Sequence, residues 1–172
     1  MDKPSITFHE ATLSDLGEMR KIVVERGETD EGIRKGFGVL IPGSGSVGHP
    51  NHVIEIARMG GKLIGFVSLH DSNYWVEVDG VGILREYRAQ FHGAMIRETI
   101  RLAEEKFPRK KMFASISDHP LRGGQKNKTE MIIARTRARK ARIKLFERYG
   151  FKVRRTKPWQ MLRAPPKINK PR

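Results

Sequence analysis

Seven residues near the middle of the chain are its most informative segment, Arg88-Ala89-Gln90-Phe91-His92-Gly93-Ala94. They follow a strand-like run, residues 75–83, and precede a helix-like run, residues 95–106. A tight loop that leads from a strand into a helix points several backbone N–H groups in one direction, and the helix dipole strengthens their attraction for an anion. The segment therefore predicts a cradle for a pyrophosphate group.

The chain before this segment has the signals of both helices and strands. Residues 5–9 alternate polar and apolar side chains, which predicts a strand, and Thr12 or Ser14 can cap a helix that runs to about Glu25. A second, short helix is expected at residues 30–40. The following Gly-, Ser- and Pro-rich residues predict a loop.

Three antiparallel strands are expected directly before the segment. Residues 53–59 and 62–69 flank Gly60-Gly61, a pair that accepts the positive φ of a tight hairpin turn. A third strand covers residues 74–83. A strand at residues 111–117 must then run parallel to the third strand, because a helix connects the two.

The last third of the chain predicts a long helix and a closing hairpin. Residues 129–149 carry apolar side chains at three- and four-residue steps, which predicts one helix with an apolar stripe. Residues 151–155 and 159–163 predict the hairpin. We expect one domain at residues 1–164 and a basic, disordered tail at residues 165–172.

Charge is distributed unevenly along the chain. Residues 1–118 hold 16 Lys and Arg against 17 Asp and Glu, whereas residues 119–172 hold 18 against 2, so the last third carries the whole excess of the +15 net charge. Clustered basic residues bind polyanions by releasing condensed counterions. A nucleic-acid partner is therefore expected, and a purely solubilising surface is the alternative. The expected contacts are Arg122, Lys126, Lys128, Arg135, Arg139 and Arg142.

Composition excludes several other classes of protein. The chain has no cysteine, which excludes disulfides and a thiol nucleophile. No segment approaches the roughly 18 apolar residues of a membrane span, and the first residues lack the pattern of a signal peptide. The histidines at positions 49, 52 and 70 match no fixed ligand spacing, so no metal site is expected. These features predict a soluble, cytoplasmic protein.

The order of elements and two motifs resemble the GNAT acyltransferase superfamily. The family's loop pattern is Gln or Arg, two residues, Gly, one residue, then Gly or Ala; Arg88 and Gly93 match it, and Phe91 stands at the first glycine. The second motif, typically Leu, Tyr, Glu, Lys, Leu, Gly, Phe, corresponds here to residues 145–151, with Phe146 in place of the tyrosine. The resemblance implies an α/β fold in which a central, mostly antiparallel twisted sheet with one parallel βαβ step is flanked by helices.

The resemblance also implies an acyl-CoA co-substrate, with acetyl-CoA as the expected donor. In the family, the loop holds the pyrophosphate, which assigns this role to residues 88–94. Free backbone groups on the preceding strand hold the pantetheine arm, which points to Ile83 and Arg85. Oligomeric state is left open by the sequence.

Two carboxylates and one hydroxyl are the expected catalytic groups. Histone-acetylating members carry a glutamate base at the position of Glu77. Strand periodicity places Asp79, Val81 and Ile83 on the same face as Glu77, and two close carboxylates raise the pKa of one of them, which suits a base that deprotonates an ammonium. The family's tyrosine acid is replaced by Phe146, so Tyr149 becomes a candidate donor.

These observations predict an N-acyltransferase that acts on an amine of a nucleic acid or of a molecule associated with one. A first alternative is a phage DNA adenine-modifying enzyme of the Mom type, which is thought to share this fold. A second is a non-catalytic GNAT-like protein that binds nucleic acid or has a structural role, because Phe91 and Phe146 depart from the family motifs.

Overall fold

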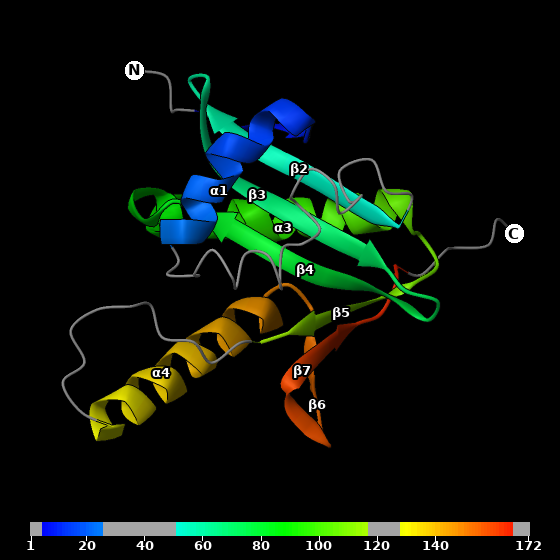
Figure 1. Ribbon diagram of the computed structural model, residues 1–172. Helices are drawn as coiled ribbons and strands as arrows, with labels where there is room; N and C mark the ends of the chain where they lie inside the picture. The colour runs from blue at the N-terminus through cyan, green and yellow to red at the C-terminus, as the bar shows by residue number, and fades with distance from the viewer. Residues whose placement is uncertain (1–4, 26–50, 117–127, 167–172) are drawn as a thin grey trace, which may run out of the picture.

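The computed structural model describes residues 5–25, 51–116 and 128–166. Its centre is a seven-stranded sheet with the order β1-β2-β3-β4-β5-β7-β6 (Figure 1). Only β4 and β5 pair in parallel; the other neighbours are antiparallel. The expected mixed sheet with one parallel step is thus confirmed. The strands are β1 (Thr7–Glu10), β2 (His52–Met59), β3 (Lys62–Asp71), β4 (Trp75–Ile83), β5 (Lys111–Ser115), β6 (Lys152–Arg154) and β7 (Lys157–Arg163).

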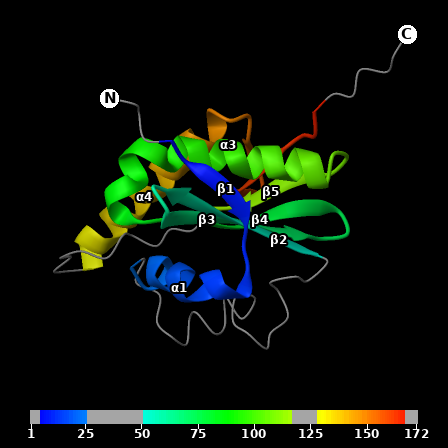
Figure 2. The same ribbon diagram turned by 90° about the horizontal axis from the view of Figure 1, so that it is seen from above.

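Helices lie on both faces of the sheet, α1 on one and α3 on the other (Figure 2). Helix α1 (Leu16–Glu25) follows the short 3-10 turn η1 (Leu13–Asp15). Beneath α1, Met19, Ile22 and Phe66 form one apolar core. The α3 face has a larger core, to which α3 contributes Met95 and Leu102. The sheet therefore separates two faces with different surroundings.

Helix α3 (Arg88–Lys106) begins seven residues earlier than the sequence predicts. The 3-10 turn η2 (Arg85–Tyr87) leads directly into it. Phe91 lies in the first turn of α3 and is only 8% exposed, in the core beneath the helix. Residues 88–94 are therefore helical, and the expected loop is wrong. The helical first turn directs the Phe91 side chain into the core.

The tight turn between β2 and β3 agrees with the sequence prediction. Gly60 and Gly61 have φ angles of +56° and +79°, in the region that favours glycine. The expected helix at residues 30–40 and most of the loop after it lie outside the described residues. In the described part of the chain, no helix is long and apolar enough to cross a membrane.

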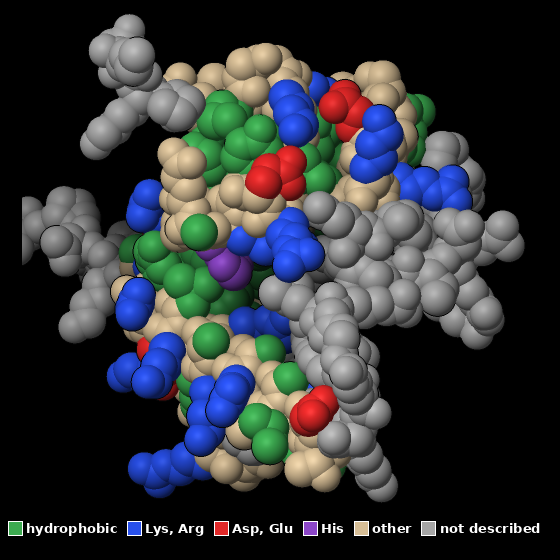
Figure 3. Space-filling view, turned by 90° about the vertical axis from the view of Figure 1, so that its left-hand side faces the viewer, with side chains coloured by type: hydrophobic (Ala, Val, Ile, Leu, Met, Phe, Trp, Pro, Cys, Tyr) green, Lys and Arg blue, Asp and Glu red, His purple; other side chains and the backbone are tan. Residues whose placement is uncertain are grey.

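Helix α4 (Lys128–Glu147) points away from the sheet at its N-terminal end (Figure 1). Lys and Arg side chains gather at the left and centre of the lower part of Figure 3. The expected apolar stripe is only partly present, because Ala141 is exposed whereas Arg135, Arg139 and Arg142 are half-buried. The helix stops before Gly150, which has a φ of +85°.

Candidate active site

Strand β4 contains a bulge that changes which side chains share a face. Ser68 of β3 pairs with Gly80, but the next residue, Leu69, pairs with Val78. Asp79 is therefore the extra residue of a β-bulge. A bulge of this kind shifts the alternation of the strand by one position.

The shift places the Glu77 and Asp79 carboxylates on the opposite face of the sheet from the side chains at the end of β4. Val78 before the bulge and Val81 and Ile83 after it all pack with the core on the α3 face. Glu77, next to Val78, points to the α1 face. The expectation that Val81 and Ile83 share the face of Glu77 is wrong, because strict period-two counting omits the bulge.

Asp79 remains on the same face as Glu77. The hydroxyl of Ser68 donates to Oδ2 of Asp79 at 3.4 Å, and Ser68 alternates with residues of the opposite core, so it points to the α1 face. Glu77 is half-buried and Asp79 is exposed. Burial first, and then the charge of Asp79, raise the pKa of Glu77, while His70 lowers it. A raised pKa makes a carboxylate a stronger base towards an ammonium group.

Two histidines that the site prediction did not include lie on the α1 face in line with Glu77. His70 of β3 is the register partner of Glu77, and His52 of β2 is the partner of His70. The two imidazole rings stack with centroids 4.4 Å apart. The turn at Gly60-Gly61 alone would pair His52 with Leu69, because a bulge between Ala57 and Arg58 shifts the register of β2 and β3 by one residue.

Beyond the bulge, one edge of β4 diverges from β5. The described pairing of β4 with β5 ends at Val78 and Ala114, whereas β4 continues to Ile83. Leu84 donates its N–H to the Ile64 carbonyl, on the β3 side. Because neighbouring residues of a strand direct their backbone groups to opposite sides, those of Ile83 face the β5 side.

The Arg88 side chain binds the backbone at the end of this edge. Its Nε donates to the carbonyl oxygen of Ile83 at 3.1 Å. Arg85 belongs to the η2 turn and not to the strand, so it does not extend the edge as the sequence suggests. Arg88 therefore links the start of α3 to the last residue of β4.

The N-terminus of α3 has the features of an anion site. Its first turn has no acidic residue and no side-chain cap, and the preceding carboxylate, Glu86 of η2, is ion-paired with Lys62 at 3.3 Å, so the helix dipole remains available to an anion. Ala89 and Gln90 are exposed there. Phe91 points into the core, so its ring does not block the approach that glycine keeps open in the family pattern. His92 and Ala94 are half-buried in the turn that follows.

Gly93 and Tyr149 bring α3 and the end of α4 together. A Cβ atom added to Gly93 would lie 2.6 Å from the Tyr149 hydroxyl oxygen. Arg97 donates to the same oxygen at 3.4 Å. Tyr149 packs with the core on the α3 face, so the sheet lies between it and the Glu77–Asp79 pair. The three predicted catalytic residues are not brought together.

The position of the family's tyrosine is filled by a buried ring. Phe146 is 8% exposed and meets Phe151 edge-to-face with centroids 5.0 Å apart. This side chain contributes to packing and has no proton to donate.

The expected nucleic-acid contacts are only partly described. Arg122 and Lys126 lie outside the described residues, and Lys128 begins α4. The remaining expected contacts, Arg135, Arg139 and Arg142, are half-buried. The exposed basic side chains of this region are instead those of Arg137, Lys140, Lys144 and Arg148. The sequence prediction did not include these four, because the exposure that distinguishes them from Arg135, Arg139 and Arg142 is visible only in the structure.

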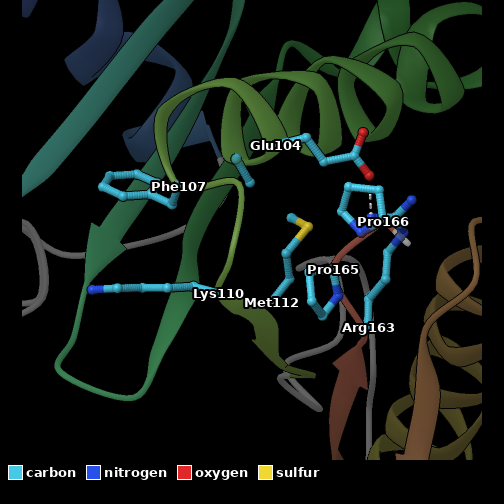
Figure 4. Close-up of a pocket in the computed structure, with 8 residues that line it drawn as sticks. Glu104, Phe107, Lys110, Met112, Arg163, Pro165 and Pro166 are labelled. Carbon is cyan, nitrogen blue, oxygen red and sulfur yellow. Dashed lines mark hydrogen bonds and ion pairs between the residues drawn. The ribbon is translucent and has the colours of Figure 1, made fainter. Parts of the chain in front are cut away.

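A shallow depression lies at the opposite end of α3 from Arg88. Glu104, Lys110, Met112 and the closing Pro165 and Pro166 line it (Figure 4). The Arg163 side chain donates to Glu104 across its rim at 2.5 Å. Ala103 lies fifteen positions after Arg88, or about 22 Å along the helix, so the depression is separate from the anion site. Within the described ranges, no group of three metal-ligating side chains gathers.

Comparison with solved structures identifies the fold. The PaiA N-acetyltransferase of Thermoplasma acidophilum, in complex with coenzyme A, superposes with a TM-score of 0.64 at 14% identity, over 93% of this chain and 99% of that one. A GNAT family acetyltransferase of Elizabethkingia anophelis with acetyl-CoA bound gives 0.59 at 13% identity, over 94% and 99%. A mutant of the spermidine N-acetyltransferase SpeG of Vibrio cholerae gives 0.56 at 15% identity, over 91% and 90%.

These likenesses show that the chain has the fold of the GNAT acetyltransferases. No model of a protein family matches the sequence, and no curated protein matches it.

Proposed function

We propose that the protein is an acyl-CoA-dependent N-acyltransferase, with acetyl-CoA as donor, whose acceptor is an amine of a nucleic acid or of a molecule associated with one. The observation that carries the proposal is the open edge of β4. The N–H of Ile83 faces the gap where β5 has ended, while its carbonyl accepts from Arg88, and α3 begins directly beyond with no acidic residue in its first turn. An extended pantetheine arm can pair with such an edge while the pyrophosphate meets the helix.

The reaction follows from the groups on the two faces of this edge. Glu77, helped by Asp79, takes a proton from the acceptor ammonium, directly or through water. The neutral amine attacks the thioester carbonyl, the C–N bond forms, and the C–S bond of the resulting intermediate breaks to release CoA thiolate. The nitrogen, positively charged after the attack, loses its extra proton to solvent as the amide forms. Holding amine and thioester together supplies much of the rate.

Tyr149 is the proposed donor of a proton to the departing thiolate. Arg97 donates to its hydroxyl oxygen, so the hydroxyl keeps its own proton for another acceptor. This assignment requires the thiolate to lie on the α3 side of the gap. Water is the competing donor, and Tyr149→Phe distinguishes the two by the size of the loss in turnover.

Release of CoA tests the proposal. We expect the purified protein to release CoA from acetyl-CoA in the presence of a polyamine, a lysine-containing peptide, aminoacyl-tRNA or DNA, with the productive acceptor identifying the substrate class. Glu77→Gln should lower turnover by about 10² or more at neutral pH. Glu86→Gln is the matched control, because Glu86 is exposed on η2. An equal effect of both substitutions would remove Glu77 from the mechanism.

The buried ring of Phe146 supports a second candidate, a non-catalytic protein of the same fold. This candidate predicts nucleic-acid binding without CoA release or acyl-CoA binding. No feature of the described site favours the adenine-modifying alternative separately, and the DNA arm of the same assay tests it.

A further inference from the structure

The N-terminal part of α4 is not held by the apolar core. The described side chains of α4 that pack with the core are Ile143, Leu145 and Phe146, all in its last two turns. Further towards the N-terminus, Ile132 and Ile133 are 53% and 46% exposed. This part of the helix points away from the sheet (Figure 1), and one side of it, at Ala134 and Ala138, is half-buried.

One side of this helix and of the turn directly after it carries a row of exposed basic side chains, the α4 row, formed by Arg137, Lys140 and Lys144 on α4 and by Arg148 just past its end. Steps of three and four residues keep them on one face of a helix. The row spans eleven positions, or about 16 Å at about 1.5 Å per residue. Within the part of the chain that the structure describes, no ion pair joins these four side chains to a carboxylate.

The α4 row destabilises the helix that carries it when no partner is bound. Lys140 and Lys144, and Lys144 and Arg148, are like charges four positions apart, and each such pair opposes helix formation by a few tenths of a kcal/mol, about 0.2–0.5. A polyanion alongside the helix would remove this repulsion and would release its own counterions.

The chemistry of α4 favours a phosphate backbone over a membrane surface. A helix that lies in a lipid interface needs a continuous apolar face opposite its charges. In α4 the exposed apolar side chains are Ile132 and Ile133 at one end, while Arg135 and Arg139 lie on the half-buried side. A linear row of cations instead matches the regular spacing of charges along a nucleic-acid strand.

We infer that the α4 row binds the sugar–phosphate backbone of a nucleic acid. The role of this binding rests on the proposed function, since a nucleic acid held along α4 would bring the acceptor amine to the protein. The binding surface itself is independent of acyl-CoA. Four contacts at about −0.9 per phosphate predict a slope of about −3.6 for log K against log salt concentration on duplex DNA.

Fluorescence anisotropy tests this surface. Labelled 20-base-pair DNA, RNA duplex of the same sequence and single-stranded RNA are titrated with the full chain between 50 and 200 mM KCl, and the tightest arm identifies the source of the phosphates. The test variant carries Gln at all four positions of the α4 row. The control carries Gln at four exposed basic positions elsewhere, Lys21, Lys106, Arg109 and Lys111, so that the net charge changes equally.

We expect the row variant to bind at least tenfold more weakly at 100 mM KCl and to lose about three units of salt slope, while the control keeps the slope. Equal weakening of both variants would mean that net charge alone attracts the ligand, and would overturn the inference. Absence of binding at 50 mM KCl, or tighter binding to vesicles with 30% phosphatidylserine, would also overturn it. Calorimetry of the row variant with acetyl-CoA separates this failure from failure of the proposed function, because the α4 row takes no part in acyl-CoA binding.

Discussion

Replacing Gly93 by alanine tests how closely α3 and the end of α4 approach each other. The new Cβ would lie 2.6 Å from the hydroxyl oxygen at the far end of the Tyr149 side chain, so that side chain must shift. Overpacking of this kind destabilises by about 1–3 kcal/mol, while the better helix propensity of alanine returns about 0.5–1 kcal/mol. We expect Gly93→Ala to lower the free energy of unfolding by about 1–2 kcal/mol.

In the Tyr149→Phe background, Gly93→Ala should raise the free energy of unfolding instead of lowering it. Without the hydroxyl, the nearest atoms to the new Cβ are Nη1 of Arg97 at 3.7 Å and the ring Cζ at 3.8 Å, both ordinary contacts. Gly93→Ala should then stabilise by about 0.5–1 kcal/mol. The four proteins form a double-mutant cycle, measured by urea unfolding with tryptophan fluorescence, with an expected coupling of about 2 kcal/mol. An equal effect of Gly93→Ala in both backgrounds would refute the reasoning.

Three further predictions concern protonation and packing. Burial and Glu98 raise the pKa of Glu55 to about 7, so the stabilisation from its protonated form is complete below about pH 4.5 and is lost as the pH rises through 7. Glu55→Gln should therefore remove about 1–2 kcal/mol of the pH dependence of the unfolding free energy between pH 5 and 8, after allowance for solvent screening, as measured by urea unfolding. A difference from wild type that does not change with pH would contradict this prediction. Because the pKa of Glu77 is raised, acyl transfer should increase with pH through that pKa, and an unchanged profile in Glu77→Gln would exclude this base. Phe91→Gly, which restores the family's glycine, should destabilise by at least about 3 kcal/mol in urea unfolding, and a neutral effect would show that the ring is not part of the core.

Much of the sheet could be predicted because local signals and topology agreed. The Gly60-Gly61 turn set the β2–β3 hairpin, and the helix between β4 and β5 required that pair to be parallel. The start of α3 was missed because Phe91 was interpreted only as a departure from a glycine pattern. Its buried ring is a long-range contact that no local signal reports.

The candidate site was predicted less well than the fold. Glu77 and Asp79 do share a face, but Val81 and Ile83 do not, because a bulge depends on pairing with β3 and leaves no pattern in β4 alone. On α4, the alanine spacing predicts the half-buried side correctly at Ala134 and Ala138 but not at Ala141, which is exposed. The position of Tyr149 against Gly93 depends on how α3 and α4 pack, which periodicity cannot report.

Isothermal titration calorimetry with acetyl-CoA tests the central claim most directly, because both the β4 edge and the α3 N-terminus are assigned to this ligand. We expect one site per chain with micromolar affinity. Arg88→Gln should weaken the binding, since Arg88 joins the Ile83 carbonyl to the start of α3, and Lys106→Gln at the far end of the same helix should leave it unchanged. Absence of binding up to millimolar acetyl-CoA, in a protein that still unfolds cooperatively, would contradict the account and leave the non-catalytic candidate.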